Sequence, residues 1–300
     1  MQLRDSDHFS LIGAGLAGPV MATYLSQLGY PVDIYESRSD MRVNSQSAGR
    51  SINLALSQRG IRALKDIGAF KKIKSSLIPM SGRMIHDADG NTHIQPYGQK
   101  KNEVIYSVSR SKLNKSLMDH AEGKENVNLH FNYDLKGIDF ENSKLNFQNK
   151  NIPFCRVLGS DGASSKVRAS IIKDSDIHFS KRPLGHGYKE LTIPPNNSTG
   201  FQLDQNALHI WPRGQFMLIA LPNFDQSFTC TLFLPMDGDN SFTSLNSEKK
   251  VVDFFKNYFP DAEELIPNLS DEYHKRPVGK LATIYCDKWH YGGIAAIFGD

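Results

Sequence analysis

A glycine-rich turn near the amino terminus carries the clearest chemistry in this 300-residue sequence. In the stretch FSLIGAGLAG, Gly13, Gly15 and Gly18 follow a short apolar strand with G-x-G-x-x-G spacing, and a second predicted strand over 31–35 then delivers Glu36. In such a unit the glycines permit a tight turn, a close approach to pyrophosphate and helix–strand packing, while the acid accepts hydrogen bonds from a ribose. The order of these features predicts a dinucleotide site, but it does not distinguish FAD from NAD.

Three further positions could act on a cofactor. The stretch SDGASSKVR over 160–168 predicts a strand that ends at Asp161 and is followed by a helix. This end is either a second candidate contact to the cofactor or an ordinary turn. Arg110 stands between a predicted strand over 104–109 and a helix, where it would either pair with a phosphate or be solvated. The last residues, IAAIFGD, predict a final strand that delivers Asp300 at its tip.

Strands and helices must bring these residues together, and the hydrophobic pattern indicates where they lie. Apolar residues at helical spacing predict helices, and alternation predicts antiparallel strands. The helices are expected over 58–67 and 249–258. Strands are expected over 50–56, 207–211, 216–221, 228–234 and 293–298, and antiparallel strands over 127–135 and 144–147.

The pattern predicts an α/β protein in which a Rossmann-like dinucleotide-binding domain is combined with a discontinuous substrate domain on a mostly antiparallel sheet, and the family resemblance described below implies that the first is an FAD-binding domain. The later sheet contains no glycine fingerprint, which favours a substrate domain over a second nucleotide fold. The expected divisions are 1–75 and 101–175 for the FAD-binding parts, 76–100 for a substrate-contacting hairpin, 176–287 for the substrate domain, and 288–300 for a truncated return strand.

Composition excludes several classes of protein. A net charge of +3 gives no argument for nucleic-acid binding. Cys155, Cys230 and Cys286 are far apart, without metal-ligand or disulfide spacing, which is typical of a reducing compartment. No signal-peptide pattern is present, and no apolar run approaches the roughly 20 residues of a membrane helix. We expect a soluble, cytoplasmic protein without a metal site, nucleic-acid partner or membrane segment.

The motifs resemble those of the class A flavin monooxygenases, the family of para-hydroxybenzoate hydroxylase. That family carries an amino-terminal G-x-G-x-x-G, a middle D-G and a late G-D, which here are GAGLAG at 13–18, SDGASSKVR at 160–168 and FGD at 298–300. A narrower resemblance, to one kind of aromatic-acid hydroxylase within this family, extends along the chain. It is carried by blocks such as GRSINLALSQRGIRALK (49–65), IPMSGRMIHDADG (78–90), SVSRSKLNKSL (107–117) and LHIWPR (208–213).

The resemblance implies bound FAD, NADPH as a transient reductant, and O2 with an aromatic acid as substrates. It assigns the substrate carboxylate to Arg83 and Tyr97, and it assigns no residue as a catalytic acid or base. The FAD contacts that it implies are Gly13, Gly15, Ala17, Gly18, Tyr35, Glu36, Ser37, Arg38, Ala55, Arg110, Leu135, Asp161 and Asp300.

The sequence itself gives a reason to pair Arg83 with Tyr97. A hairpin is expected to turn at Asp89-Gly90-Asn91, because Gly and Asn tolerate positive φ. A three-residue loop centred on Gly90 would place Arg83 directly opposite Tyr97, on one face. A two-residue loop at Asp89-Gly90 would place them on opposite faces, so the loop length is a test.

Other side chains receive less specific interpretations. His86 and His209 are expected in strands as packing or hydrogen-bonding residues, since no histidine forms a metal spacing or a nucleophile–base pair. A larger set of apolar sheet residues is expected either to wall an aromatic pocket or to pack in the core: Phe216, Leu218, Leu221 and Leu234.

Three alternatives stay open. The chain would act on a different aromatic acid, or bind flavin without turnover, or be an NAD(P)-dependent reductase, which the middle and late flavin motifs disfavour. The second alternative rests on the end at Asp300, where the family continues. The resemblance then implies that one wall of the flavin ring, the pocket's lid and the carboxyl-terminal membrane anchor of eukaryotic members are absent.

Overall fold

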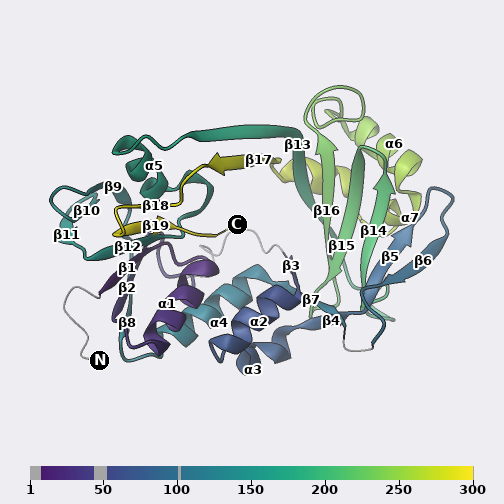
Figure 1. Cartoon of the computed structure of the whole chain (residues 1–300). Helices are drawn as coiled ribbons and strands as arrows, with labels where there is room; N and C mark the ends of the chain where they lie inside the picture. Colours follow the sequence, from purple (N-terminus) through teal and green to yellow (C-terminus); the bar gives the residue numbers. More distant parts are fainter. Residues whose placement is uncertain (1–7, 44–52, 101–102, 300) are drawn as a thin grey trace.

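The computed structural model describes residues 8–43, 53–100 and 103–299 (Figure 1). The described strands form one six-stranded sheet, one seven-stranded sheet and two three-stranded sheets. In Figure 1 the six-stranded sheet lies on the left and the seven-stranded sheet on the right, and the chain crosses between them more than once. The predicted α/β class, with mixed and antiparallel sheets, is confirmed.

The six-stranded sheet holds the glycine-bearing unit. Its order is β18-β19-β12-β1-β2-β8, and every neighbouring pair except β18–β19 is parallel. Leu11 and Ile34, on its central strands, are fully buried, as expected where helices cover both faces of a parallel sheet. Its elements are β1 (Phe9–Ile12), α1 (Ala17–Gln27), β2 (Val32–Glu36), α4 (Arg110–Glu122), β8 (Val127–Phe131), β12 (Arg156–Gly159), η4 (Gly162–Ser164), α5 (Lys166–Lys173), β18 (His290–Tyr291) and β19 (Ala295–Ile297).

The antiparallel prediction for residues 127–135 is wrong in its first half. The strand β8 pairs in parallel with β2, with Val127 opposite Val32. Because β8 is the edge strand of the sheet, its outward side chains stay partly exposed, and this produces the alternation without an antiparallel neighbour. The prediction holds for 144–147, which lies in an antiparallel sheet ordered β11-β10-β9. Its strands are β9 (Leu135–Asp139), β10 (Lys144–Phe147) and β11 (Asn151–Pro153).

A small antiparallel sheet ordered β3-β7-β4 lies between the two large sheets (Figure 1). Leu54 and Leu56 pack against the same buried cluster as Leu16 and Val20, so one face of β3 is turned toward this core. Ser109 caps α4, since its hydroxyl accepts from the Lys112 amide. The elements are β3 (Asn53–Leu56), α2 (Gln58–Asp66), α3 (Phe70–Ile73), η3 (Lys74–Ser76), β4 (Ile78–Met80) and β7 (Ile105–Ser109).

The seven-stranded sheet has the order β17-β13-β16-β15-β14-β5-β6 and is antiparallel except for the pair β14–β5. The long strand β13 runs from the region of α5 into this sheet, with β17 beside it (Figure 1). The strand and helix predictions over 207–234 and 249–258 are confirmed. The elements are β5 (Gly82–His86), β6 (Thr92–Pro96), β13 (Phe179–Ile193), β14 (Ala207–Arg213), β15 (Phe216–Pro222), β16 (Phe228–Pro235), α6 (Glu248–Tyr258), α7 (Pro260–Glu263), α8 (Leu269–Lys275) and β17 (Gly279–Cys286).

The two faces of this sheet differ. One face, here called the helix face, packs against α6, α7 and α8 around the fully buried Trp211 and Phe255. Phe216, Leu218 and Leu234 belong to this core, so for these three residues the packing interpretation is the right one. The other face, here called the open face, carries the alternate residues, which the register places in rows across the sheet: Arg83, Ile85, Leu208, Ile210, Met217, Ile219, Leu221, Thr229 and Phe233.

The hairpin of β5 and β6 has a three-residue loop, but its centre is Asp89, one residue earlier than predicted. The Asp87 amide donates to the Asn91 carbonyl at 3.0 Å, and Arg83 stands directly opposite Gln95. The Asp87 carboxylate accepts from the amides of Asp89 and Asn91, and this side-chain turn favours the earlier centre. The prediction that Arg83 stands directly opposite Tyr97 is therefore wrong, because its partner is Gln95, two residues earlier on the second strand. Side chains alternate with a period of two, so Arg83 and Tyr97 still lie on the same face.

The carboxyl-terminal strand predicted over 293–298 is present as the shorter β19, which lies beside β12 in the six-stranded sheet. The domain boundaries given above stay a prediction. Within the described ranges, no helix combines the length and the apolar character that a membrane span needs.

Candidate functional site

The glycine turn between β1 and α1 is shaped by close backbone contacts. Gly13 has φ +100°, and its amide donates to the Tyr35 carbonyl at 2.8 Å. A Cβ on Gly18 would lie 2.1 Å from the Gly13 carbonyl oxygen, so only glycine permits this helix–strand contact. A Cβ on Gly15 would meet nothing within 4 Å. The turn at Gly15 thus borders open space, and no side chain caps α1, which leaves its first amides available to an anion.

Glu36 lies at the carboxyl end of β2, directly beside this turn. Its carboxylate accepts from the amide of Ala14 at 2.9 Å and from Nε of Arg38 at 2.8 Å, and the residue is buried. Burial raises the carboxyl pKa, but the Arg38 and Ala14 hydrogen bonds outweigh it, and the pKa is lowered from its ordinary value. A fixed negative charge therefore stands at the place where the sequence predicts a ribose partner.

The neighbours of Glu36 divide into packing and polar residues. The ring of Tyr35 is buried and stacks on His130 with centroids 4.9 Å apart, so its side chain serves the core. Ser37 donates its hydroxyl to Glu36 at 3.3 Å, and Arg38 has a 59% exposed side chain that can still reach a ligand.

Asp161 approaches the same turn from β12. A Cβ on Gly13 would lie 2.7 Å from the Ser160 carbonyl oxygen and 3.1 Å from the Asp161 Cα. One carboxylate oxygen of Asp161, Oδ2, accepts from the Lys166 amide at 2.6 Å. The other, Oδ1, is buried and has no hydrogen-bond partner among the described residues. A buried acceptor of this kind calls for a donor, and a ligand hydroxyl would supply one.

The remaining predicted cofactor residues have different surroundings. Ala55 is exposed on β3, on the face opposite the core-packed Leu54 and Leu56, and Arg110 is exposed at the first turn of α4. Leu135 is buried in the core with Ile12, so its side chain does not face a ligand. Asp300 lies outside the described residues. The structure thus brings together the ends of β1, β2 and β12, with Ala55 on the adjoining small sheet and Arg110 at the start of α4, directly after that sheet's strand β7.

Arg83 and Tyr97 meet on the hairpin as a stacked pair. The guanidinium carbon of Arg83 lies 4.6 Å from the centroid of the Tyr97 ring. Arg83 is exposed, and across 8–43, 53–100 and 103–299 no acidic side chain forms an ion pair with it. Stacking on the ring leaves the N–H edge of the guanidinium available, and a carboxylate fits that edge bidentately.

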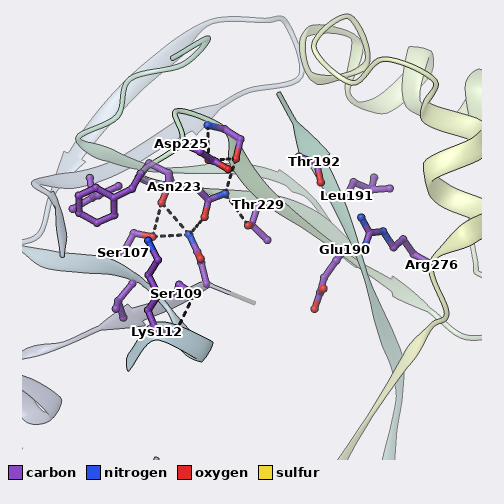
Figure 2. Close-up of a pocket in the computed structure, with 16 residues that line it drawn as sticks. Ser107, Ser109, Lys112, Glu190, Leu191, Thr192, Asn223, Asp225, Thr229 and Arg276 are labelled. Carbon is purple, nitrogen blue, oxygen red and sulfur yellow. Dashed lines mark hydrogen bonds between the residues drawn. The ribbon is translucent and has the colours of Figure 1, made fainter. Parts of the chain in front are cut away.

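A cavity of about 330 Å³ lies between the small sheet and the seven-stranded sheet (Figure 2). One side is a polar cluster in which the Asn53 amide donates to Ser107 at 3.1 Å and to Asn223 at 2.6 Å. Glu190 and Arg276 stand on the other side in Figure 2. Hydroxyl, amide and charged groups of both signs suit a polar molecule.

Sequence reasoning missed this cavity, because none of the residues predicted for the site lines it. Asn53 lies two residues before Ala55 and therefore on the same face of β3, which sets the cavity beside a predicted FAD contact. The available signal was a polar residue inside an apolar strand, as with Asn53 in NLAL and Ser107 in IYSVS.

The parallel sheet, the glycine turn and the acid at the end of β2 define a dinucleotide-binding α/β protein. The family model described as "FAD binding domain" matches residues 9–178, more than half of the chain, and the chain belongs to this family. FAD is thus the cofactor of the site. The open space at Gly15 and the unsatisfied oxygen of Asp161 fit a bound diphosphate and a hydroxyl-bearing ligand.

Relatives confirm the narrower resemblance seen in the sequence, which is to kynurenine 3-monooxygenase. The chain is 45% identical over 293 residues to the kynurenine 3-monooxygenase of Dictyostelium discoideum, covering 97% of this chain and 63% of the relative. It is 44% identical over 298 residues to that of Legionella pneumophila (strain Corby), covering 98% and 66%. The chain spans less than two thirds of the length of these curated relatives.

Solved structures share the fold. The tetrameric form of 2-methyl-3-hydroxypyridine-5-carboxylic acid oxygenase superposes with a TM-score of 0.77 at 20% identity, covering 99% of this chain and 76% of that one. The tetracycline destructase Tet(51) has a TM-score of 0.63 at 19% identity, covering 98% and 74%.

Proposed function

We propose that this chain takes part in the FAD-dependent, NADPH-consuming hydroxylation of L-kynurenine to 3-hydroxykynurenine with O2. The family match and the names of the relatives support the cofactor and the substrate. The observation that carries the proposal is the exposed Arg83–Tyr97 pair on the open face, since a free guanidinium backed by a phenol is suited to an amino-acid carboxylate.

The FAD contacts follow from the site geometry. The glycine turn and the start of α1 would hold the diphosphate, Glu36 the adenosine ribose, and Asp161 a hydroxyl of the ribityl chain. Arg38 and Arg110 are exposed cations able to neutralise phosphate charge, while Tyr35 and Leu135 would contribute backbone groups only. Asp300 completes the set as a sequence-based assignment.

FAD, reduced by NADPH, supplies the oxygen-transfer chemistry when bound. The chain's own residues bind and orient the substrate. Arg83 would hold the carboxylate while Tyr97 donates a third hydrogen bond, and neither would move a proton in the reaction. The aromatic amine of kynurenine already activates the ring position beside it, so the chemistry needs no strong protein base.

The open face explains how water would be kept from the reacting ring. Ile210, Ile219 and Phe233 on this face are partly buried and form an apolar surface on the strands beyond β5, interrupted by Thr231, which stands opposite Ile219. An aromatic ring placed against this surface loses water on one side while the carboxylate stays at the hairpin.

The test is the absorbance spectrum of the purified protein with added FAD, followed by NADPH oxidation with kynurenine and a panel of other aromatic carboxylates. We expect a flavin spectrum and oxidation that responds selectively to kynurenine. A yellow protein without kynurenine-dependent turnover would support flavin binding and contradict the proposed hydroxylation. A stronger response to another aromatic acid would identify that acid, and not kynurenine, as the substrate.

A further inference from the structure

A chain of hydrogen bonds joins the hairpin strand β5 to α7 across the helix face. His86 Nδ1 lies 2.7 Å from Asp261 Oδ2, and His86 Nε2 lies 2.9 Å from His209 Nδ1. His209 Nε2 in turn lies 2.9 Å from the Asp204 carbonyl oxygen. The His86 ring stacks on Trp211 at 4.0 Å, and both histidines are buried.

The protons in this chain can be placed by donor and acceptor accounting. The Asp204 carbonyl can only accept, so His209 carries its proton on Nε2. Burial lowers the pKa of His209 to about 4, so its Nδ1 is an acceptor and His86 must donate to it from Nε2. A neutral His86 would then present a lone pair to Asp261 at 2.7 Å.

One further proton must therefore lie between His86 Nδ1 and Asp261. Asp261 Oδ2 already accepts from Trp211 Nε1 at 2.8 Å. Burial raises the pKa of Asp261, but the hydrogen bonds from His86 and Trp211 outweigh it, and the pKa is lowered. A single carboxylate oxygen that accepts from both Trp211 Nε1 and His86 Nδ1 satisfies both contacts, so donor and acceptor accounting places the proton on His86 Nδ1.

The position of this pair relates it to the hairpin. His86 and Arg83 are three residues apart on one strand, so they point to opposite faces of the sheet. The partner strand β6 is exposed along its whole length and forms the sheet edge. The contact to α7 is therefore one of few that hold the hairpin from its buried side; a second is Arg213, which donates to the His86 carbonyl at 2.9 Å.

We propose that His86, as an imidazolium, and Asp261 form a partly buried ionic clamp that fixes the β5–β6 hairpin and so positions Arg83 on the opposite face. The His86–Asp261 contact itself is given by the hydrogen-bond geometry, independently of any substrate. Its effect on substrate binding rests on the proposed function, in which Arg83 holds the substrate carboxylate.

Nitrogen-15 NMR of labelled histidine side chains tests the clamp without any substrate. At about pH 7.5, where a free imidazole is largely neutral, we expect one histidine with both ring nitrogens protonated, absent in H86A. The change Asp261→Asn removes the negative charge. Because Oδ2 accepts from both His86 and Trp211, a single amide atom at that position cannot accept from Trp211 and also donate to His86, and we expect the doubly protonated histidine signal to be lost. A neutral His86 in the unchanged protein would overturn the clamp.

Amide hydrogen exchange and kinetics test the positioning. H86A should speed exchange in β5 and β6 by about 10-fold, and raise the kynurenine KM by about 10- to 100-fold with kcat and FAD affinity little changed. Matched controls are His274→Ala and Asp271→Asn, both exposed on α8. Unchanged exchange in H86A would refute the positioning of the hairpin by His86.

If the unchanged protein showed no kynurenine turnover, only the proposed function would be refuted, since NMR and hydrogen exchange still test the clamp. Should H86A not fold, Asp261→Asn supplies the same comparison with a smaller effect.

Discussion

The glycine turn and the β5–β6 hairpin present two ways of building a site. The turn, with its acid, is formed by one stretch from β1 to β2, and its geometry is fixed by backbone contacts such as the close approach of Gly18 to Gly13. The hairpin is held by β14 and by α7, which lie more than 100 residues away in sequence. A local motif can be recognised in a sequence, whereas a site held by distant partners is seen only after folding.

The charged groups of the glycine turn and of the hairpin also differ in how they are held. Glu36 is buried and already paired with Arg38 and the Ala14 amide, so its position is set before a ligand arrives. Arg83 is exposed and stacked only on Tyr97, so its strongest partner would be the substrate. The first region is rigid through its backbone; the second depends on how the hairpin is anchored.

The largest effect is expected at Gly18. An alanine there would place Cβ 2.1 Å from the Gly13 carbonyl oxygen, and the resulting strain should cost about 3 kcal/mol of unfolding free energy and abolish FAD binding. Chemical denaturation of the cofactor-free protein and FAD titration measure both quantities.

Gly15→Ala is the matched control. Its Cβ meets open space, so stability without FAD should stay unchanged while FAD affinity falls by about 10-fold, since the methyl group would occupy the phosphate approach. Equal losses of stability in both variants would contradict the distinction between a packing glycine and a ligand-facing one.

Arg83→Ala should raise the kynurenine KM by about 10- to 100-fold, because it removes about 1.5–3 kcal/mol of charge-assisted hydrogen bonding. FAD affinity and stability should not change, since the side chain is exposed. Tyr97→Phe keeps the stacked ring and should have a smaller effect, within about 10-fold. Normal turnover by the arginine variant would remove Arg83 from the substrate site.

Glu36→Gln should show a smaller, pH-dependent effect. Because the folded-state pKa of Glu36 is lowered from 4.5, its contribution to stability is present above about pH 4.5 and is lost as the pH falls through the lowered value. The unchanged protein should exceed the variant by about 1–3 kcal/mol at neutral pH, and the difference should shrink in acid. Thermal unfolding across this range measures it, and a difference independent of pH would argue against a charge effect.

Particular elements show what could be predicted. The glycine turn, Glu36 and the strands over 207–234 were predictable, because each depends on residues close in sequence. The direction of β8 was not, since an edge strand of a parallel sheet alternates like an antiparallel strand. The hairpin register was off by one pair because the Asp87 side chain moved the centre of the turn.

The sequence by itself determined the cofactor class and the fold class, and it named Arg83 and Tyr97 as a pair; the loop length seen in the structure decided that they share one face. The tertiary structure alone decided the cavity beside Asn53, the unsatisfied oxygen of Asp161 and the contact between His86 and Asp261. The reason is physical: glycine spacing and strand periodicity are encoded over a few residues. Burial, proton placement and cavity shape arise only where segments far apart in the chain meet.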